Sequence, residues 1–471
     1  MEKFLAKVGI SKKMALVGLG FFFLYLFVAY GFFYADRHVA DIDGNLAFHY
    51  PTWGYDSPEY TKLADGLLLR HSFNFENNTP PDLLRTPGYP LLLALTKLVT
   101  GKFWPIIIFQ IFCALLVALL TFKMGVRLNA RRVGIGAALL FLISPSTIFH
   151  TVVFMNELTF MTAFILSLYV LFFPPVCFQK RWWCAPVFSG LLLAVATYIR
   201  PLTLYIPLLF VCCYFLVYMR SGWGTIGKSM TAFMLVFWAV IIPWIYHNGT
   251  KSGVYTFSTI GTYNLVFFNA SDFLEKHFGN TSTEFLTYQK QLDTIPMYNA
   301  RPQKPWNEIV ALPKHVLAMY PRGYIAYHLS YLSVFFISSG ARYDVQMIHY
   351  PKVKAFFGLS EGIPSLLSEI KAHHFKGAFV TLSSQGVFTV ERLLLCVLTL
   401  ASLIAVFATR SPKVRNLLLV LLLIILYFAV LTGPASIPRY RLPVDPLIFL
   451  LGLFALSRYY VMLKMRKQKA F

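Results

Sequence analysis

The stretch NLLLVLLLIILYFAVLT at residues 416–432 decides the class of fold. It contains no charged side chain, and the connection just before it is basic, with Arg410, Lys413 and Arg415. A helix needs about 20 mostly apolar residues to cross the hydrocarbon core of a membrane. We therefore predict a membrane-spanning helix here, with its basic flank on the cytoplasmic side.

The same pattern recurs along the chain. Of the 471 residues, 57% are apolar and 13% are charged, whereas soluble proteins carry about 25% charged residues. The predicted spans lie near residues 14–34, 103–122, 133–149, 158–174, 184–199, 202–219, 230–246, 387–408, 416–432 and 444–462. We expect an all-α fold, a polytopic transmembrane bundle of about 10 to 13 spans, with amphipathic juxtamembrane helices in its outer loops.

The net charge of +22 can be explained without a nucleic-acid partner. The short connections between spans are basic, as the positive-inside rule requires of cytoplasmic loops. Acidic residues concentrate elsewhere: eight of the 20 lie in 35–104 and eight in 248–386. Both of these segments are therefore predicted to lie outside, with the N- and C-termini in the cytoplasm.

Three parts follow from this topology. Residues 1–247 hold seven spans, with the first outer loop, 35–104, inserted after the first span. Residues 248–386 form a second outer region, in which the short apolar segment 324–338 is expected to be an interfacial or re-entrant helix. Residues 387–471 form a closing unit of three spans.

The first outer loop contains a helix start at Ser57-Pro58-Glu59. Ser57 is expected to cap this helix, with Pro58 at its first position. The apolar stripe that begins at Tyr60 suits a helix lying on the membrane surface. Asp56 precedes the helix, where a turn can direct it towards the bundle. A second short apolar helix is expected from Leu91 to Val99.

Three acidic residues are candidates for catalysis. Asp56 and Glu59 lie in the outer loop, where burial against the membrane would raise their proton affinity and suit a base. The alternative is that Asp56 is a second cap and Glu59 a solvated first-turn acid. Glu157 lies next to Asn156 at the outer end of an apolar span, which makes it a functional candidate. His150 is a weaker neighbour.

Arginines at the outer edge form the second group of candidates. Positive charge here runs against the topological bias, and guanidinium groups bind phosphate well. The residues are Arg85, Arg200 before Pro201, and Arg439, Tyr440 and Arg441 in Pro-Arg-Tyr-Arg-Leu-Pro at 438–443. The alternative partners are ordinary phospholipid headgroups.

Taken in order, these motifs resemble the GT-C glycosyltransferases, of the protein O-mannosyltransferase and lipid A aminoarabinose transferase type. The resemblance spans most of the chain, although no single motif is specific. Its elements are Asp56-x-x-Glu59-Tyr60 with Ala64, Arg85-Thr-Pro-Gly-Tyr-Pro90, Ser144-Pro145 followed by Glu157, Thr197-Tyr-Ile-Arg200-Pro201-Leu-Thr203, Pro243-Trp244 with Asn248, and Arg439-Tyr440-Arg-Leu-Pro443. The loop departs from the family in having one carboxylate at the key turn instead of an adjacent acidic pair.

The resemblance implies an inverting transfer of sugar from a polyprenyl-phosphate donor, such as an undecaprenyl carrier, to a glycolipid, polysaccharide or protein acceptor on the extracytoplasmic side. Asp56 would be the catalytic carboxylate, with Glu157 as the second acid. Arg439 and Tyr440 would approach the donor phosphate, as would Arg85, Arg200 and Arg441. Tyr55, Glu59, Tyr60 and His150 would line the acceptor cavity.

Several expectations about context accompany this hypothesis. Membrane lipids are the expected surroundings and nucleic acid is not an expected partner. No cofactor is expected, and a divalent metal stays open. By analogy, the location is the bacterial inner membrane, with a role in the cell envelope or lipopolysaccharide. The alternatives are an O-antigen polymerase or ligase and a lipid-linked oligosaccharide transporter.

Overall fold

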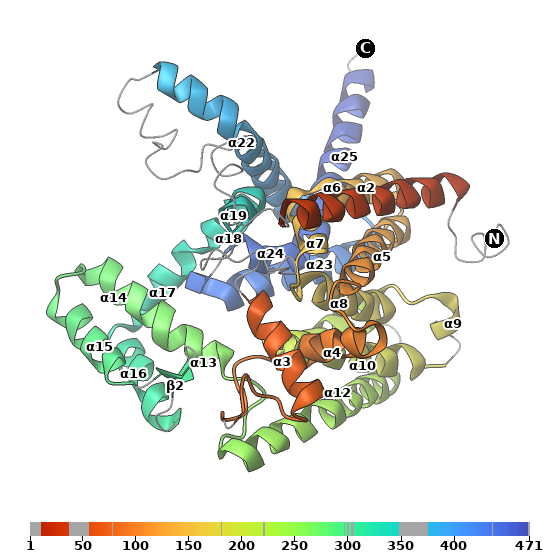
Figure 1. Ribbon diagram of the computed structural model, residues 1–471. Coiled ribbons are helices and arrows are strands. Elements are labelled where there is room, and N and C mark those ends of the chain that lie inside the picture. Colours follow the sequence, from red (N-terminus) through yellow and green to blue (C-terminus); the bar gives the residue numbers. More distant parts are fainter. Residues whose placement is uncertain are drawn as a thin grey trace.

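The computed structural model describes residues 11–36, 56–77, 79–179, 181–219, 222–295, 297–298, 301–302, 306–347, 375–435 and 437–469. Within them the chain is almost entirely helical, as predicted (Figure 1). Its strands there are two-residue segments, β1 (Met297–Tyr298) and β2 (Arg301–Pro302), paired antiparallel.

Every predicted span corresponds to a helix. These helices are α2 (Lys12–Asp36), α5 (Ile106–Arg127), α6 (Arg131–Ile143) with α7 (Pro145–Val152), α8 (Glu157–Phe172), α10 (Cys184–Ile199), α11 (Ile206–Tyr218), α12 (Trp223–Ser252), α22 (Phe375–Ile404), α23 (Pro412–Thr432) and α25 (Asp445–Lys469). In the described part of the chain, 6 helices are long and apolar enough to cross a membrane. The α6–α7 pair, bent by 54° after Ile143, would be a seventh. The remaining three, α8, α10 and α11, are shorter apolar helices.

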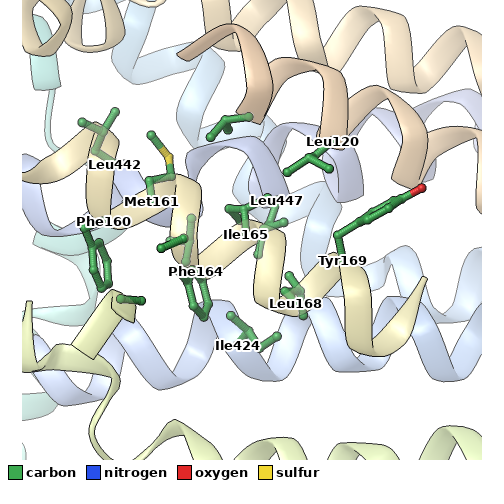
Figure 2. Close-up of a cluster of buried hydrophobic side chains, with 14 of the residues drawn as sticks. Leu120, Phe160, Met161, Phe164, Ile165, Leu168, Tyr169, Ile424, Leu442 and Leu447 are labelled. Atoms are coloured by element: carbon green, nitrogen blue, oxygen red, sulfur yellow. The ribbon is translucent and has the colours of Figure 1, made fainter. Parts of the chain in front are cut away.

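Helix α8 lies at the centre of the bundle. Its residues are buried on all sides, which is why a short and mostly apolar segment can be a helix here. Figure 2 shows Phe164 and Leu168 of α8 packed near Ile424 of α23 and Leu447 of α25. Close packing of this kind holds helices together in lipid, where burial of apolar surface gives little advantage. The central position of α8 fixes Glu157, its first residue, inside the protein.

The first loop contains two helices, α3 (Ser57–Leu69) and α4 (Gly88–Thr100), packed against each other. The predicted cap was wrong: the N-cap residue is Asp56, whose side chain makes no capping bond, and Pro58 is the second helical residue. Ser57 instead donates from Oγ to the carbonyl oxygen of Phe154, at 3.0 Å. The apolar stripe of α3 is also not a membrane-surface face, because Tyr60 and Leu63 are buried in protein.

The second region continues from α12 as a series of short helices. They are α13 (Ile260–Asn264), a π-helical turn (Leu265–Asn269), α14 (Ala270–Phe278), α15 (Thr283–Asp293), α16 (Trp306–Met319), α17 (Pro321–Ser330), α18 (Leu332–Ile337) and α19 (Gly340–Met347). Helices α14, α15 and α16 group at one side of the molecule (Figure 1). A small core that includes Phe273, Tyr288 and Tyr324 holds this group together. The predicted helix at 324–338 is divided into α17 and α18.

The remaining helices are connections of three to four residues. They are α9 (Val176–Gln179), α24 (Pro438–Arg441) and 3-10 turns at Pro201–Thr203, Ala405–Ala408, Gly433–Ala435 and Leu442–Val444. Two of them matter for the site: Pro201–Thr203 follows α10, and α24 leads through Leu442–Val444 into α25.

Candidate active site

Five charged residues from distant parts of the chain meet where several helices end. They are Asp56 at the start of α3, Arg85 shortly before α4, Glu157 at the start of α8, Arg200 just after α10 and Arg439 in α24. The sequence nominates all five separately. The structure brings them into one ion-pair cluster.

Asp56 is held by two arginines. Its Oδ1 lies 2.5 Å from Nη2 of Arg85 and its Oδ2 lies 2.7 Å from Nη1 of Arg439. Burial alone would raise the pKa of this carboxyl group, but the charges of Arg439 and Arg85 hold its pKa well below the usual value. The expectation of raised proton affinity was therefore wrong, because the cations outweigh the burial.

Glu157 is fully buried. Its Oε1 accepts a hydrogen bond from Nε of Arg439 and lies 3.2 Å from Nη1 of Arg200. Its Oε2 lies 4.0 Å from Nε2 of His150, whose Nδ1 is 2.8 Å from the carbonyl oxygen of Ser146. Arg439 thus bridges the two candidate carboxylates.

Glu59 completes the cluster, since its Oε2 accepts from Nε of Arg85 at 2.7 Å. It is therefore more than a first-turn acid. With Glu59 the cluster contains three acidic side chains and three arginines, so the formal charges balance. Balance of this kind is what allows ions to persist away from water, where an unpaired buried charge is costly.

Aromatic side chains and an amide complete the walls. Tyr60 accepts a hydrogen bond on its OH from Nδ2 of Asn156, at 2.8 Å, and Arg85 lies over the Tyr60 ring. The guanidinium carbon of Arg200 lies 5.0 Å from the ring centre of Tyr440, in a cation–π contact. These contacts fix the directions in which the two arginines point.

The backbone before α4 is clamped against the end of α10. Thr86 donates from Oγ1 to the carbonyl oxygen of Ile199 at 3.1 Å. At Gly88, a Cβ atom would lie 2.6 Å from the backbone of Tyr198, so only glycine permits this approach. On the other side, Ser258 donates from Oγ to the carbonyl oxygen of Leu84 at 2.7 Å. These contacts fix the backbone around Arg85 against the end of α10, next to Arg200.

A cavity of about 400 Å³ opens above the cluster. Its lining includes Asp56, Tyr60, Arg85, Asn156, Arg200, Arg439 and Tyr440, together with residues of the second region such as Thr262, Asn264 and Asn269. Two polar atoms of the lining residues are buried without a hydrogen bond among the described residues, Oδ1 of Asn156 and Oδ1 of Asn269, whereas Nη1 of Arg200 has its ion pair with Glu157. Such atoms are costly unless a ligand meets them.

Other predicted site residues lie elsewhere. Arg441 is buried away from the cavity: it pairs with Asp445, Nε to Oδ1 at 2.8 Å, and donates to backbone carbonyls of α18 and Ser338. We therefore correct its assignment from phosphate binding to packing. His150 contacts Glu157 but is not among the lining residues, and Tyr55 lies outside the described residues.

Sequence reasoning missed Asn269 and passed over Asn156. Asn156 adjoins Glu157, so its position at the end of an apolar span was a usable signal. Asn269 shows no comparable signal, because its direction depends on a π-helical turn. Among the described residues no group of three or more His, Cys, Asp or Glu side chains could hold a metal ion. The absence of a cofactor stays a prediction.

Comparisons with known proteins bear on this arrangement. Residues 84–247, about a third of the chain, match the model of the dolichyl-phosphate-mannose-protein mannosyltransferase family. No curated protein matched the chain.

Among solved structures, the oligosaccharyltransferase of Archaeoglobus fulgidus, tethered to an acceptor peptide, is 11% identical with a TM-score of 0.49. The match covers 95% of this chain, which spans 50% of the length of that protein. ArnT from Cupriavidus metallidurans bound to undecaprenyl phosphate is 14% identical with a TM-score of 0.39, over 93% of this chain and 78% of that one.

The apolar helices define the chain as a multi-pass membrane protein with a charged cavity at its helix ends. The matched segment contains Arg85, Glu157 and Arg200, three members of the ion-pair cluster. Residues 84–247 are therefore similar to the dolichyl-phosphate-mannose-protein mannosyltransferase family, in agreement with the resemblance expected from the sequence motifs.

Proposed function

We propose that the chain transfers a sugar from a polyprenyl-phosphate carrier to a hydroxyl or amine acceptor on the extracytoplasmic side of the membrane. The observation that carries this proposal is the bridge made by Arg439 between Asp56 and Glu157, beside an open cavity. A donor phosphate needs a cation that can exchange a carboxylate partner for the phosphate. Arg439 bonds to two carboxylates and lines the cavity, so it is placed to make this exchange.

The phosphate would be held by Arg439 and Arg200. Guanidinium groups bind phosphate with paired hydrogen bonds, and both of these arginines line the cavity. Glu157 lies beneath both cations and keeps them in place, because it is buried and pairs with each. In this scheme Glu157 is a positioning residue.

Asp56 would receive the acceptor. The acceptor oxygen or nitrogen attacks the anomeric carbon opposite the phosphate, a new glycosidic bond forms, and the bond to the phosphate oxygen breaks with its electron pair. Inversion follows from this single displacement. The proton of the acceptor passes to Asp56, whose low pKa rises when a phosphate draws Arg439 away from it. Donor binding would thereby convert a weak base into a stronger one.

Transfer by purified protein tests the proposal. Undecaprenyl-monophosphate sugars are supplied with glycolipid, polysaccharide and peptide acceptors, and product is measured by mass spectrometry. Transfer with wild-type protein and none with the Asp56→Asn variant is the expected result. Consumption of pyrophosphate-linked oligosaccharide instead would establish a ligase or polymerase. The bacterial inner membrane stays the predicted location.

A further inference from the structure

Helix α2 borders a groove on the outside of the bundle. It lies beside α5 and α7 (Figure 1), and only 11% of its most apolar stretch is buried inside the protein. Between the first half of α2 and the facing sides of α5 and α6 lies a groove of about 660 Å³. This groove shares no lining residue with the cavity above the ion-pair cluster, so it is separate from the candidate active site.

Tyr25 closes one end of the groove. Its side chain is fully buried, and its OH donates to the carbonyl oxygen of Leu142 at 2.6 Å. That carbonyl belongs to the last turn of α6, where backbone acceptors have no partner within the helix. The rings of Phe22 and Phe112, which both line the groove, lie 5.3 Å apart between their centres. These contacts fasten α2 to the bundle at this end.

Positive charge lies at the other end of the groove. Lys13, exposed near the start of α2, is the one charged side chain among the described residues of the lining. Because α2 is fastened near the start of α5 and the end of α6, its own start lies towards the end of α5 and the start of α6. Those helix ends are also basic, with Arg127, Arg131 and Arg132. The positive-inside rule predicts that this end of the bundle faces the cytoplasm.

The length of the groove matches one leaflet of a membrane. On α2 the lining extends from Lys13 to Phe22, nine residues further on, which at 1.5 Å per residue is about 14 Å. The hydrocarbon core of a bilayer is about 30 Å thick, so one leaflet contributes about 15 Å. A lipid chain lying in the groove would therefore extend from the basic end to the closed end.

The walls of the groove suit a hydrocarbon chain. Apart from Lys13 the lining is apolar, and it includes the exposed side chains of Val17, Leu19 and Leu139. Exposed apolar side chains are ordinary on a helix in lipid, so they do not define a site by themselves. This groove differs from a plain lipid-facing surface because it is concave, closed at one end and bounded by a cation at the other. A basic side chain at the membrane surface attracts anionic headgroups.

We propose that the groove binds a chain of an anionic phospholipid from the leaflet at the basic end of the bundle, with the lipid phosphate beside Lys13. The chain fills the space between α2 and α6, where the protein lacks packing contacts, and so holds the first half of α2 in place. This lipid is distinct from the proposed sugar carrier, whose phosphate would lie at the cavity lined by Arg439. The inference does not depend on the proposed function.

Thermal unfolding of the full chain in detergent tests the site. Protein freed of native lipid is titrated with phosphatidylglycerol or with phosphatidylcholine of the same chain length, and the rise in Tm gives the apparent affinity. Phosphatidylglycerol should stabilise the wild-type protein more than phosphatidylcholine does. Lys13→Gln should weaken phosphatidylglycerol binding about fivefold, because one cation beside the headgroup is lost. Lys228→Gln, which removes an exposed lysine of α12, is the control and should change neither affinity.

Two glycines of α2 provide a matched pair of variants. Gly18 lines the groove and Gly20 does not, yet a Cβ atom added to either residue would meet nothing within 4 Å. Gly18→Phe should fill the groove and abolish stabilisation by phosphatidylglycerol. Gly20→Phe makes the same change in the same helix but leaves the groove open, so the stabilisation should persist.

Three results would overturn the assignment. Equal stabilisation of wild-type protein by the two lipids would show that the headgroup charge is not recognised. Loss of the effect in Gly20→Phe as well as in Gly18→Phe would show that lipid acts on the whole surface of α2. A wild-type dimer that Gly18→Phe separates would place a second copy of the chain in the groove. Transfer activity is not measured, so failure of the proposed function leaves this test unaffected.

Discussion

Arg439 and Arg441 are two positions apart on the same short helix, α24, yet they are used in different ways. Arg441 is 1% exposed and pairs with Asp445 one turn further along the chain. Its remaining bonds go to backbone carbonyls of Phe335, Phe336 and Ser338. Arg439 instead joins Asp56 and Glu157, two carboxylates from separate parts of the chain, beside the cavity.

The difference shows how to recognise a buried arginine that can work on a ligand. Arg441 bonds to a carboxylate close in sequence and to carbonyls that no substrate can displace, so it fastens α18 to the start of α25. Arg439 and its partner Asp56 both line a ligand-sized cavity, so a phosphate in the cavity can compete with that carboxylate for the arginine. Burial alone does not separate the two cases. The identity of the partners and their position relative to the cavity do.

The largest expected effect on the comparison of Arg439 with Arg441 comes from a change at Asp56, the carboxylate that pairs with both Arg439 and Arg85. Asp56→Asn keeps the shape of the side chain but removes its charge and basicity. We expect transfer to fall by about 10²- to 10⁴-fold, the range for a lost general base. The measurement is kcat with saturating donor, alongside thermal unfolding in detergent. Asp65→Asn, which removes an ion pair with Lys97 in the same loop, is the control and should retain full activity.

The second prediction concerns Arg441. Arg441→Ala leaves Asp445 buried without its partner and should lower stability by about 3–5 kcal/mol. The change would appear as a lower Tm and less folded protein, while KM and kcat per folded molecule stay unchanged. A rise in KM for the donor without loss of stability would show that Arg441 acts on the substrate, and the comparison would fail.

The third prediction sharpens the role of Arg439. Arg439→Lys keeps one positive charge but cannot bridge two carboxylates and a phosphate, because the guanidinium fork is lost. The KM for the donor should rise about tenfold, consistent with loss of one bond between charged groups. Titration with bare undecaprenyl phosphate should show the same weakening. If only Tm changes, Arg439 is structural like Arg441.

The fourth prediction contrasts Asp56 with Asp344 of α19. Asp344 accepts a hydrogen bond from Oγ of Ser146 at 2.6 Å, and burial raises its pKa well above the usual value. In the unfolded chain this carboxyl group ionises above about pH 4, so the native state loses relative stability as the pH rises through that range. Asp344→Asn should therefore raise Tm modestly at pH 7. The gain should shrink as the pH falls towards 4.

For Asp56 the sign is opposite. Its pKa is lowered in the folded state, so its contribution to stability is fully present above about pH 4 and is lost only at more acidic pH. Melting curves of the Asp344→Asn and Asp56→Asn variants, recorded from pH 4 to 8, compare the two cases. A Tm gain for Asp344→Asn that does not depend on pH would contradict this account of Asp344.

The sequence predicted the helices well because membrane spans depend on composition. Residues 416–432 are apolar enough that no alternative structure is available in lipid, and the structure has α23 there. Glu157 and Arg439 could be nominated because a charge at the edge of an apolar segment is unusual. Their partners could not be named, since 282 residues separate them.

The direction in which a side chain points was harder to predict than the helix to which it belongs. Arg439 and Arg441 belong to one four-residue helix, and only tertiary packing decides which of them faces the cavity. The same applies to Asp56, whose expected rise in pKa was reversed by arginines from two other segments. Asn269 depends on a π-helical turn that no pattern of apolar residues reveals.

The wide separation of Glu157 and Arg439 has a consequence for biosynthesis. The first loop and α8 are made before α24, because Arg439 follows Glu157 by 282 residues. Until then, Glu157 and Asp56 lack the cation that bridges them. A chain that ends before residue 439 would keep Arg85 beside Asp56 and Arg200 beside Glu157, but it would lack the arginine that joins the two carboxylates. We therefore expect the proposed transfer only from chains whose synthesis has passed residue 439.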